Sequence, residues 1–404
     1  MIRYVWQVSP LGVRVLFVSS FLMNLGFYAL IPYLTLYLTG SFAWSMAMAG
    51  VLLGIRQFSQ QGFSFLGGAL ADRIGCKEAM IFGVFVRATG FLAFAFCTEV
   101  WQFIVAAILS GLGGALFEPA FLAAFARLTP EKGRKEIFSF RSVVINTGMV
   151  VSTLVGSVLA SIEFFYLSVV SATLFMFVAV LIWITLPKIE AENNGKSWLG
   201  DVRDIISNRP FVAYTIILIG YYYLYMQLFL TIPRQMKEVT GDTSGVAIIY
   251  ATISLAIIFL QLKVTRWLRG VSAQFIMIGA GTLMMGLSLF LLGFVTTIGT
   301  VIAVGLLFAL GNMVAAPVMY DVVTLFAPPN RLGSYYGFNS FSLAVGGSLS
   351  TSFGGWLYDV GLASGFMLLP WLVCLCIGLL VFFSMYKLEV SRQPRYVRTK
   401  ANEG

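Results

Sequence analysis

Four charged side chains interrupt long apolar stretches of this sequence. Arg56, Arg87 and Glu118 lie in the first half of the chain, and Asp321 lies in the second. A charged group near the middle of a bilayer costs on the order of 3 kcal/mol even on lenient scales, so each one needs a partner or water. Arg141 lies about one turn inside a further apolar stretch, and we expect it near a membrane surface. The acids could move protons, and the arginines could pair with them or bind an anion.

Glu118 is the first candidate for proton uptake and release. The proton affinity of a carboxyl group depends on its burial and on nearby charges, and both can change when a cavity opens or closes. Either of the two buried arginines is the expected neighbour, and Pro119 lets the surrounding helix bend because proline removes a backbone hydrogen bond. A permanent structural pair between Glu118 and an arginine is the alternative. Asp321 is the second candidate, with pairing to Arg331 or its surroundings as the alternative.

A tyrosine-rich stretch in the second half of the chain offers a different chemistry. Tyr221 and Tyr225 lie one helical turn apart and share a face, and Gln227 follows them. Rings that carry hydroxyl groups suit a wet, apolar cavity, where they stack on amphiphiles or bind cations. An aromatic belt at the membrane surface is the alternative. Asn24 and Tyr28, in the first apolar stretch, are further candidates for lining a substrate cavity.

The composition requires a membrane. Of the 404 residues, 59% are hydrophobic and 11% are charged, whereas an ordinary soluble domain has about 25% charged residues. A soluble globule, a disordered chain and a secreted disulfide scaffold are excluded by these values. The chain has no histidine, and its four cysteines show neither metal-ligand nor paired secretory spacing. We therefore expect no metal site, no cofactor and no intramembrane enzyme.

Twelve apolar segments have about the length that a helix needs to cross a bilayer. They predict an all-α polytopic membrane protein with two six-helix bundles around a central cavity. We expect an N-terminal bundle over 1–188, a cytoplasmic linker over 189–210, a C-terminal bundle over 211–388 and a basic cytoplasmic tail over 389–404. Within the linker, 198–206 predicts a short amphipathic helix. The segments are 14–39, 44–70, 78–97, 101–127, 136–160, 163–186, 211–233, 245–264, 273–293, 298–326, 333–357 and 365–386.

Basic residues are concentrated in alternate loops. The even-numbered loops and the C-terminal tail hold most of them, whereas the odd-numbered loops hold only Arg234 and Lys237. The positive-inside rule therefore places both termini and the even-numbered loops in the cytoplasm. The same asymmetry explains the net charge of +9. No nucleic-acid partner is expected, because the chain has no recognition helix, zinc-finger spacing or soluble basic face.

The two halves of the sequence resemble each other at an offset of 198 residues. Gly113 and Pro119, in the fourth predicted segment (101–127), match Gly311 and Pro317 in the tenth (298–326). The same offset pairs glycines of helix 5 with glycines of helix 11, as with Gly148 and Gly346. One offset held across two consecutive helices predicts a six-helix unit used twice, related by an axis along the membrane normal.

The loop after the second segment carries a motif, GALADRIGCK, which runs from Gly68 to Lys77. It resembles the G-x-x-x-D-R-x-G-R-K signature of the major facilitator superfamily and lies at the matching place, between helices 2 and 3 of twelve. Gly68 and Gly75 allow close backbone approach and a tight turn. The resemblance implies the major facilitator fold, with Asp72 docking near the start of helix 11 and Arg73 as its ion-pair partner. An ordinary solvated cytoplasmic turn is the alternative.

Further stretches are similar to one branch of that superfamily, the MdtH-type proton-coupled multidrug exporters. They are GIRQFSQQG at 54–62, the pair Val86-Arg87, and LSGLGG followed by FEP within 109–119. The similarity covers most of the chain and is densest in helices 2 to 4. Three features depart from the pattern: Cys76 replaces the first arginine of the loop motif, helix 1 has no acidic residue, and helix 5 has no G-x-x-x-G-P motif.

The resemblance implies a secondary active transporter of the bacterial inner membrane that exports small amphiphilic compounds, such as drugs, by proton antiport. Export of an endogenous anionic metabolite such as a siderophore, or of a lipid-like molecule, is the alternative, and with an anionic substrate Arg56 and Arg87 would be its ligands. The expected partners are a small-molecule substrate, protons and membrane lipids, and we expect a monomer. A receptor with a transporter fold is a different class, which would bind without flux. No G-x-x-x-x-G-K-[ST] loop is present, so ATP does not drive the protein directly.

Overall fold

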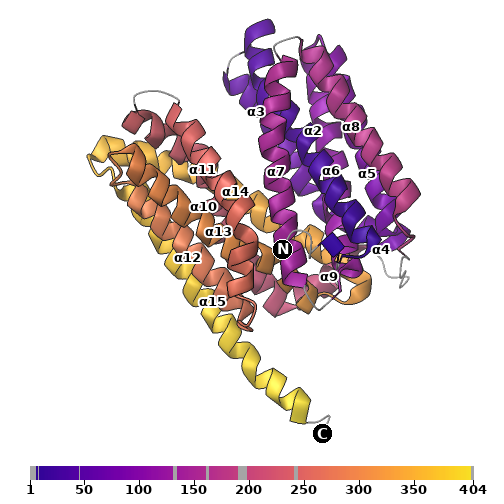
Figure 1. Cartoon of the computed structure of the whole chain (residues 1–404), viewed down its shortest axis with the longest axis vertical. Coiled ribbons are helices and arrows are strands. Elements are labelled where there is room, and N and C mark those ends of the chain that lie inside the picture. The colour runs from indigo at the N-terminus through magenta and orange to yellow at the C-terminus, as the bar shows by residue number, and fades with distance from the viewer. Residues whose placement is uncertain are drawn as a thin grey trace. The chain divides into compact units, whose positions relative to one another are not determined.

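A computed structural model describes residues 6–7, 9–44, 46–130, 134–160, 163–189, 198–240 and 244–401. Over these ranges the chain forms helices and no β-strand, which confirms the predicted all-α class. Figure 1 labels the helices in chain order. Parts of the linker (190–197) and of the tail (402–404) lie outside the described residues.

The helices of the first half correspond to the first six predicted segments, and α9 corresponds to the short helix predicted in the linker. The second predicted segment is divided into two helices at Phe63, which follows Gly62, a residue type that weakens a helix interior. The bounds are α2 Leu11–Ser41, α3 Met46–Gly62, α4 Ser64–Ile74, α5 Cys76–Ala93, a 3-10 turn Phe94–Phe96, α6 Val100–Leu128, α7 Arg134–Ala160, α8 Phe164–Thr185 and α9 Trp198–Ser207.

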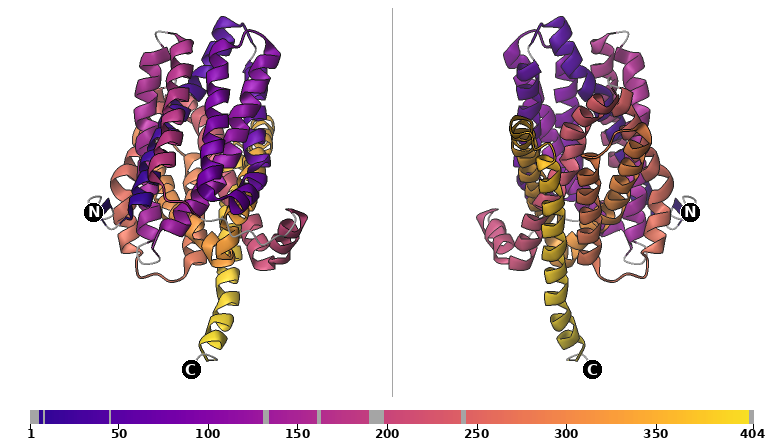
Figure 2. Two further views of the ribbon diagram at one scale, coloured as in Figure 1. Left: turned by 90° about the vertical axis from the view of Figure 1, so that its right-hand side faces the viewer. Right: turned by 90° about the vertical axis from the view of Figure 1, so that its left-hand side faces the viewer.

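The helices of the second half correspond to the other six predicted segments, but three of them extend further than predicted. Helices α10, α14 and α15 continue past the ends predicted at residues 233, 357 and 386, respectively. Helix α15 also continues past the other helices of its unit (Figure 2). The bounds are α10 Arg209–Thr240, α11 Ser244–Trp267, α12 Gln274–Leu292, α13 Ile298–Phe326, a 3-10 turn Pro329–Arg331, α14 Leu332–Ser364 and α15 Leu369–Ala401.

Eight of the described helices are long and apolar enough to cross a membrane, judged by length and composition. They include α5, α6 and α8 of the first half and α12, α13 and α15 of the second. A hydrophobic span of this length satisfies its backbone hydrogen bonds internally, which is what a bilayer demands of a crossing segment. The described part of the chain is therefore built as a multi-pass helical membrane protein.

The predicted internal repeat is present in the positions of the helices. Five helices of the first half begin 198 residues before their counterparts: α2 at 11 and α10 at 209, α3 at 46 and α11 at 244, α5 at 76 and α12 at 274, α6 at 100 and α13 at 298, and α7 at 134 and α14 at 332. The last pair, α8 at 164 and α15 at 369, departs from this spacing. Both α6 and α13 contain a proline at the matching position.

The chain divides into two compact units. Unit 1 comprises 1–137, 143–204 and 327–341, and unit 2 comprises 138–142, 205–326 and 342–404. The predicted bundles, 1–188 and 211–388, are continuous ranges of the sequence, whereas these units are defined by spatial contacts. The bounds of the bundles therefore stay predictions.

Each unit has a close glycine contact between two of its helices. In unit 1 a Cβ atom on Gly83 of α5 would collide with the backbone of α6 at Gly113. In unit 2 a Cβ atom on Gly281 of α12 would collide with the carbonyl of Gly311 on α13. The two contacts are related by the offset of 198 residues. Small residues let helix backbones approach closely in a membrane, so this repeated contact sets the helix spacing in both units.

Candidate functional site

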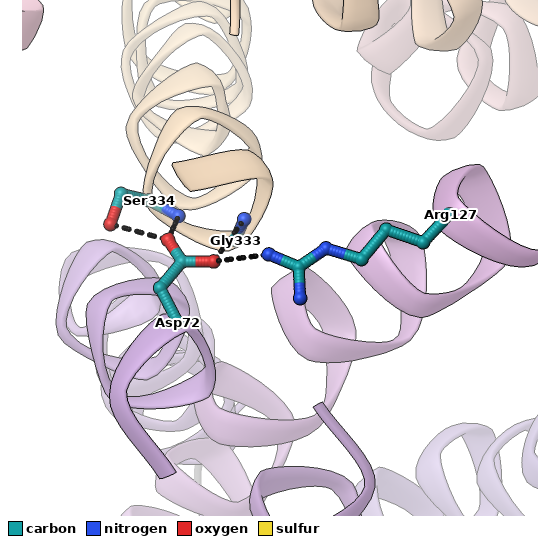
Figure 3. Close-up of polar contacts among 4 residues, drawn as sticks. All are labelled: Asp72, Arg127, Gly333 and Ser334. Atoms are coloured by element: carbon teal, nitrogen blue, oxygen red, sulfur yellow. Dashed lines mark hydrogen bonds and ion pairs between the residues drawn. The ribbon is translucent and has the colours of Figure 1, made fainter. Parts of the chain in front are cut away.

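The carboxylate of Asp72, near the end of α4, accepts hydrogen bonds from the first turn of α14, and both segments belong to unit 1 (Figure 3). The backbone N–H groups of Gly333 and Ser334 donate to it at 3.0 and 2.7 Å, and the hydroxyl of Ser334 donates at 2.8 Å. The first N–H groups of a helix have no partner inside the helix and carry partial positive charge. Asp72 therefore caps α14 from a distant part of the chain.

Arg127, at the end of α6, supplies a cation to the same carboxylate. Its Nη2 atom lies 3.3 Å from Oδ1 of Asp72. Arg127 also acts electrostatically on Cys76, the residue that replaces an arginine of the loop motif. Arg127 thus supplies a positive charge near Cys76, the position at which the motif has an arginine. Arg73, the predicted partner of Asp72, is half-buried on α4.

Burial raises the pKa of Asp72, while the three donors of α14 and the charge of Arg127 oppose that rise. Asp72 is buried, so a charged carboxylate loses hydration there. The hydrogen bonds from Gly333 and Ser334 replace only part of that hydration.

Glycines bring the backbones of α4 and α14 close enough for this contact. A Cβ atom on Gly68 would overlap the backbone carbonyl of Gly333, and one on Gly337 would overlap that of Ser64. Gly75, between α4 and α5, has a φ of 102°, a conformation that side chains disfavour. Glycine is therefore required at these positions for approach and for the turn.

Lys77 anchors the far side of the loop. Its Nζ atom donates to the backbone carbonyl of Leu186 at 2.6 Å, just past the end of α8. Lysine can bond the unpartnered carbonyls at the C-terminal end of a helix and interacts favourably with its partial negative charge. The loop motif is thus held at two helix ends, the first turn of α14 and the last of α8.

Arg56 and Arg87 lie beside the same aromatic ring in unit 1. Their guanidinium carbons lie 4.8 and 4.9 Å from the centre of Phe27 on α2. Arg87 also lies 5.9 Å from the ring of Phe91 and 5.4 Å from that of Phe175. Cation–π contacts of this kind stabilise a cation most where water is excluded, and both arginines are buried.

Glu118 belongs to this cluster through Arg87, on which it acts electrostatically. It lies on α6, half-buried, and directly precedes Pro119. Tyr28 on α2 is also half-buried and acts electrostatically on Arg56 and Arg87. The structure thus brings three of the sequence-predicted charges together with one predicted cavity residue.

Asn24 lies one turn before Tyr28 on α2 and is half-buried. Its amide donates to the backbone carbonyl of Ser20 at 2.7 Å, so part of its hydrogen-bonding capacity is used within its own helix. The carbonyl oxygen of that amide is an acceptor of the kind that a polar substrate could use.

The predicted tyrosines form a polar and aromatic cluster in unit 2. The hydroxyl of Tyr221 donates to the side-chain oxygen of Asn312 on α13 at 2.7 Å. The ring of Tyr225 is stacked on that of Tyr221 with centroids 6.2 Å apart. Gln227 is buried, and its amide lies against Gly354 of α14. Asn312 was not singled out from the sequence, because a lone asparagine in an apolar segment carries no pattern.

Arg141 and Asp321 contact residues of unit 2. The guanidinium carbon of Arg141, on α7, lies 5.4 Å from the ring of Tyr320. The side chain of Gln274, the first residue of α12, donates to Oδ2 of Asp321 at 2.8 Å.

Arg331 forms an ion pair with Asp204 at 2.8 Å, within unit 1. The side chain of Asp204 is 43% exposed, so solvent screens the pair and its contribution to stability is small.

A pocket of about 560 Å³ in unit 2 contains none of these candidates. Phe275, Phe326 and Leu388 contribute to its wall, with Arg209 at the start of α10. The volume suits a small ligand, but the charges described above lie elsewhere. The described residues include no group of three acids or cysteines placed to hold a metal ion.

Replacing Asn312 by alanine is expected to destabilise the protein by about 1–3 kcal/mol, because the buried hydroxyl of Tyr221 loses its acceptor. The double variant Tyr221→Phe with Asn312→Ala should lose less than the sum of the single changes, since neither polar group is then left alone. Thermal unfolding in detergent measures both effects. Tyr225→Phe is the control, because it removes a hydroxyl one turn away. Additive losses would contradict this coupling.

The sequence of this chain is similar to those of known proteins. The sequence model of the Major Facilitator Superfamily matches residues 16–351. Multidrug resistance protein MdtH of Photorhabdus laumondii is 33% identical over 384 residues, covering 94% of this chain and 95% of the relative. The MdtH protein of Salmonella typhi is 31% identical over 390 residues, covering 96% of this chain and 97% of the relative.

Solved structures share the fold at low sequence identity. The human organic anion transporter MFSD10 has a TM-score of 0.77 at 15% identity, covering 93% of this chain and 98% of that one. The E. coli fucose:proton symporter FucP has a TM-score of 0.75 at 17% identity, covering 94% of this chain and 98% of the FucP chain. With the helical repeat and the loop motif, these matches identify a multi-pass membrane transporter and not an enzyme. The chain belongs to the major facilitator superfamily.

Proposed function

We propose that this protein exports small amphiphilic compounds across the bacterial inner membrane in exchange for protons, by alternating access. The names of its MdtH relatives, which are multidrug resistance proteins, support this substrate class. The bias of basic residues toward alternate loops supports cytoplasmic termini. The protein works as a monomer in contact with membrane lipids.

The observation that carries the proposal is the half-buried Glu118 beside Arg87 on facing helices of unit 1. An acid inside the membrane marks a proton path by default, because its charge is costly unless it is paired or hydrated. Proton binding to Glu118 would remove the negative charge that faces Arg87. A substrate that needs the same carboxylate then competes with the proton, which is the requirement for antiport.

The aromatic groups near both candidate regions suit amphiphilic substrates. Phe27 and Tyr28 accompany the arginines of unit 1, and Tyr221 and Tyr225 stack in unit 2. Aromatic rings bind apolar bodies by stacking and cations by their faces. Export of an endogenous anionic compound is a second candidate, which the two buried arginines beside Phe27 support.

The docking of Asp72 on α14 supplies a contact that can be made and broken during the cycle. It joins residues more than 260 positions apart through hydrogen bonds to one carboxylate. Contacts of this size favour one conformation only by their own free energy, so they can stabilise one state without preventing the other.

Everted membrane vesicles test the proposed function. Respiration acidifies their interior, and a pH-sensitive acridine dye reports proton release when a compound is added. We expect cationic and zwitterionic amphiphiles to release protons from vesicles that contain the protein and not from matched vesicles without it. Equal responses in both preparations, for cationic dyes and anionic chelators alike, would contradict proton antiport.

A further inference from the structure

The charges in the cluster around Phe27 do not balance, because two arginines lie there with one acid. Arg56 and Arg87 are 5% and 4% exposed, and Glu118 is the acid that acts on Arg87. The groups that act electrostatically on Arg56 are Arg87 and Tyr28, so in the described part of the chain this cation faces another cation and a phenol. A buried cation without an anion is costly in a membrane protein and is usually functional.

Arg56 is held in place by neutral groups. Its Nη1 atom donates to the side-chain oxygen of Gln60 at 2.9 Å, and its Nη2 atom donates to that of Gln57 at 2.8 Å. These bonds use two of the five N–H donors of a guanidinium. The Nε atom is buried and has no hydrogen-bond partner among the described residues. The group is therefore oriented by its neighbours while it keeps donors for an acceptor that the described residues do not supply.

Aromatic and polar groups that remain partly accessible surround Arg56. Phe27 and Tyr28 are half-buried on α2, and Gln60 is half-buried one turn from Arg56 on α3. Phe27 lies 4.8 Å from the guanidinium carbon. A carboxylate attached to an aromatic body would find there both a desolvated cation and ring surface. Arginine suits this task because its planar fork matches the two oxygens of a carboxylate.

We infer that Arg56 binds the carboxylate of a zwitterionic aromatic amphiphile. The inference rests on the proposed function and assigns a substrate class to the same site. Glu118 acts electrostatically on Arg87 but is not among the groups that act on Arg56. We therefore assign the substrate carboxylate to Arg56 and the positive group of the substrate to Glu118. A proton on Glu118 then competes with the cationic end of the substrate, which keeps the arrangement consistent with antiport.

A matched pair of dyes tests the assignment. Rhodamine 110 carries a free carboxylate, and rhodamine 123 is its methyl ester with the same cationic ring system. Fluorescence anisotropy measures the binding of each to the full-length protein in lipid nanodiscs near neutral pH. The ratio of their dissociation constants isolates the carboxylate, because every contact of the cationic ring is shared.

We expect wild-type protein to bind rhodamine 110 about tenfold more tightly than its ester, the scale of one hydrogen-bonded charge pair. Arg56→Gln should bring the ratio close to one. Arg266→Gln, which removes an exposed arginine near the end of α11, should leave the ratio unchanged. A wild type that does not prefer the free acid would overturn the inference, as would a folded Arg56→Gln protein that keeps the preference.

Two further measurements keep the test decisive. If Arg56→Gln does not fold, Arg56→Met replaces the buried cation by an apolar side chain that a bilayer tolerates, and the same loss of preference is expected. The binding assay needs no proton gradient. Failure of antiport in vesicles with an intact dye preference would therefore reject the proton coupling alone, and loss of the dye preference with intact antiport would reject the role of Arg56 alone.

Discussion

Replacing Asp72 by alanine is expected to release the first turn of α14 from α4. The change leaves the N–H groups of Gly333 and Ser334 without their acceptor and removes the anion that faces Arg127. An unsatisfied buried donor costs about 1–3 kcal/mol. We therefore expect the docked state to lose about 2 kcal/mol, which lowers its equilibrium constant against the released state about 30-fold.

The aspartate contributes both hydrogen bonds and charge, and Asp72→Asn separates them. Burial raises the pKa of Asp72 in the docked state, so the docked carboxyl holds a proton more tightly than a released, hydrated one. Docking is therefore favoured at low pH and weakens as the pH rises through the docked-state pKa. A neutral asparagine should accordingly lose less docking than alanine, and its docking should not depend on this titration.

Electron spin resonance distances measure this change. Labels at Ile74 and Phe341, both exposed, report the separation of α4 and α14 after the exposed Cys376 is replaced by serine. Asp72→Ala should add or enlarge a long-distance population. Asp204→Ala is the matched control, because it removes the more exposed partner of Arg331 next to the start of α14. Identical distance distributions in wild type and Asp72→Ala would show that the carboxylate does not hold the two helices together.

The helices and their repeat could be predicted from the sequence because the bilayer makes strong and simple demands. A crossing segment must be long, apolar and internally hydrogen-bonded, so its composition alone marks it. The offset of 198 residues, first visible in a few glycines and prolines such as Pro119 and Pro317, also relates the starts of five helix pairs. Helix ends were less accurate, since polar residues can extend a helix beyond the membrane, as in α15.

Arg127 shows why the loop contact could only partly be predicted. The motif marks Asp72 and its glycines, but the cation that approaches the carboxylate comes from the end of α6, 55 residues later. Sequence spacing does not reveal which helix end faces the loop. Cys76 was the available clue, because an arginine missing from the motif leaves room for a cation from another element.

The buried charges were identifiable one by one, but their grouping was not. Each of Arg56, Arg87 and Glu118 is conspicuous in an apolar segment. Phe27, which both arginines approach, is one of 36 phenylalanines, so nothing in the sequence distinguishes it. The contacts between α2, α3 and α5 depend on three-dimensional packing, which periodicity within a single helix does not encode.

Glu118→Gln is expected to abolish compound-dependent proton release while leaving the protein folded. Glutamine keeps the size and hydrogen-bonding capacity of glutamate, but its amide does not bind and release a proton at physiological pH. In everted vesicles that contain the variant, the acridine signal should match that of vesicles without the protein. Rhodamine 123 should also bind the variant more weakly, since its cationic ring loses the carboxylate that faces Arg87.

Two other acids make the result specific. Glu163→Gln changes an exposed glutamate before α8 and should leave proton release intact. Asp321→Asn should also retain release, because this carboxyl is bonded to Gln274 in unit 2. Release that survives in Glu118→Gln but disappears in Asp321→Asn would move the coupling site to α13 and leave Glu118 as the structural partner of Arg87. The three variants thus separate a proton carrier from a fixed ion pair, two roles that require the same residues in the same places.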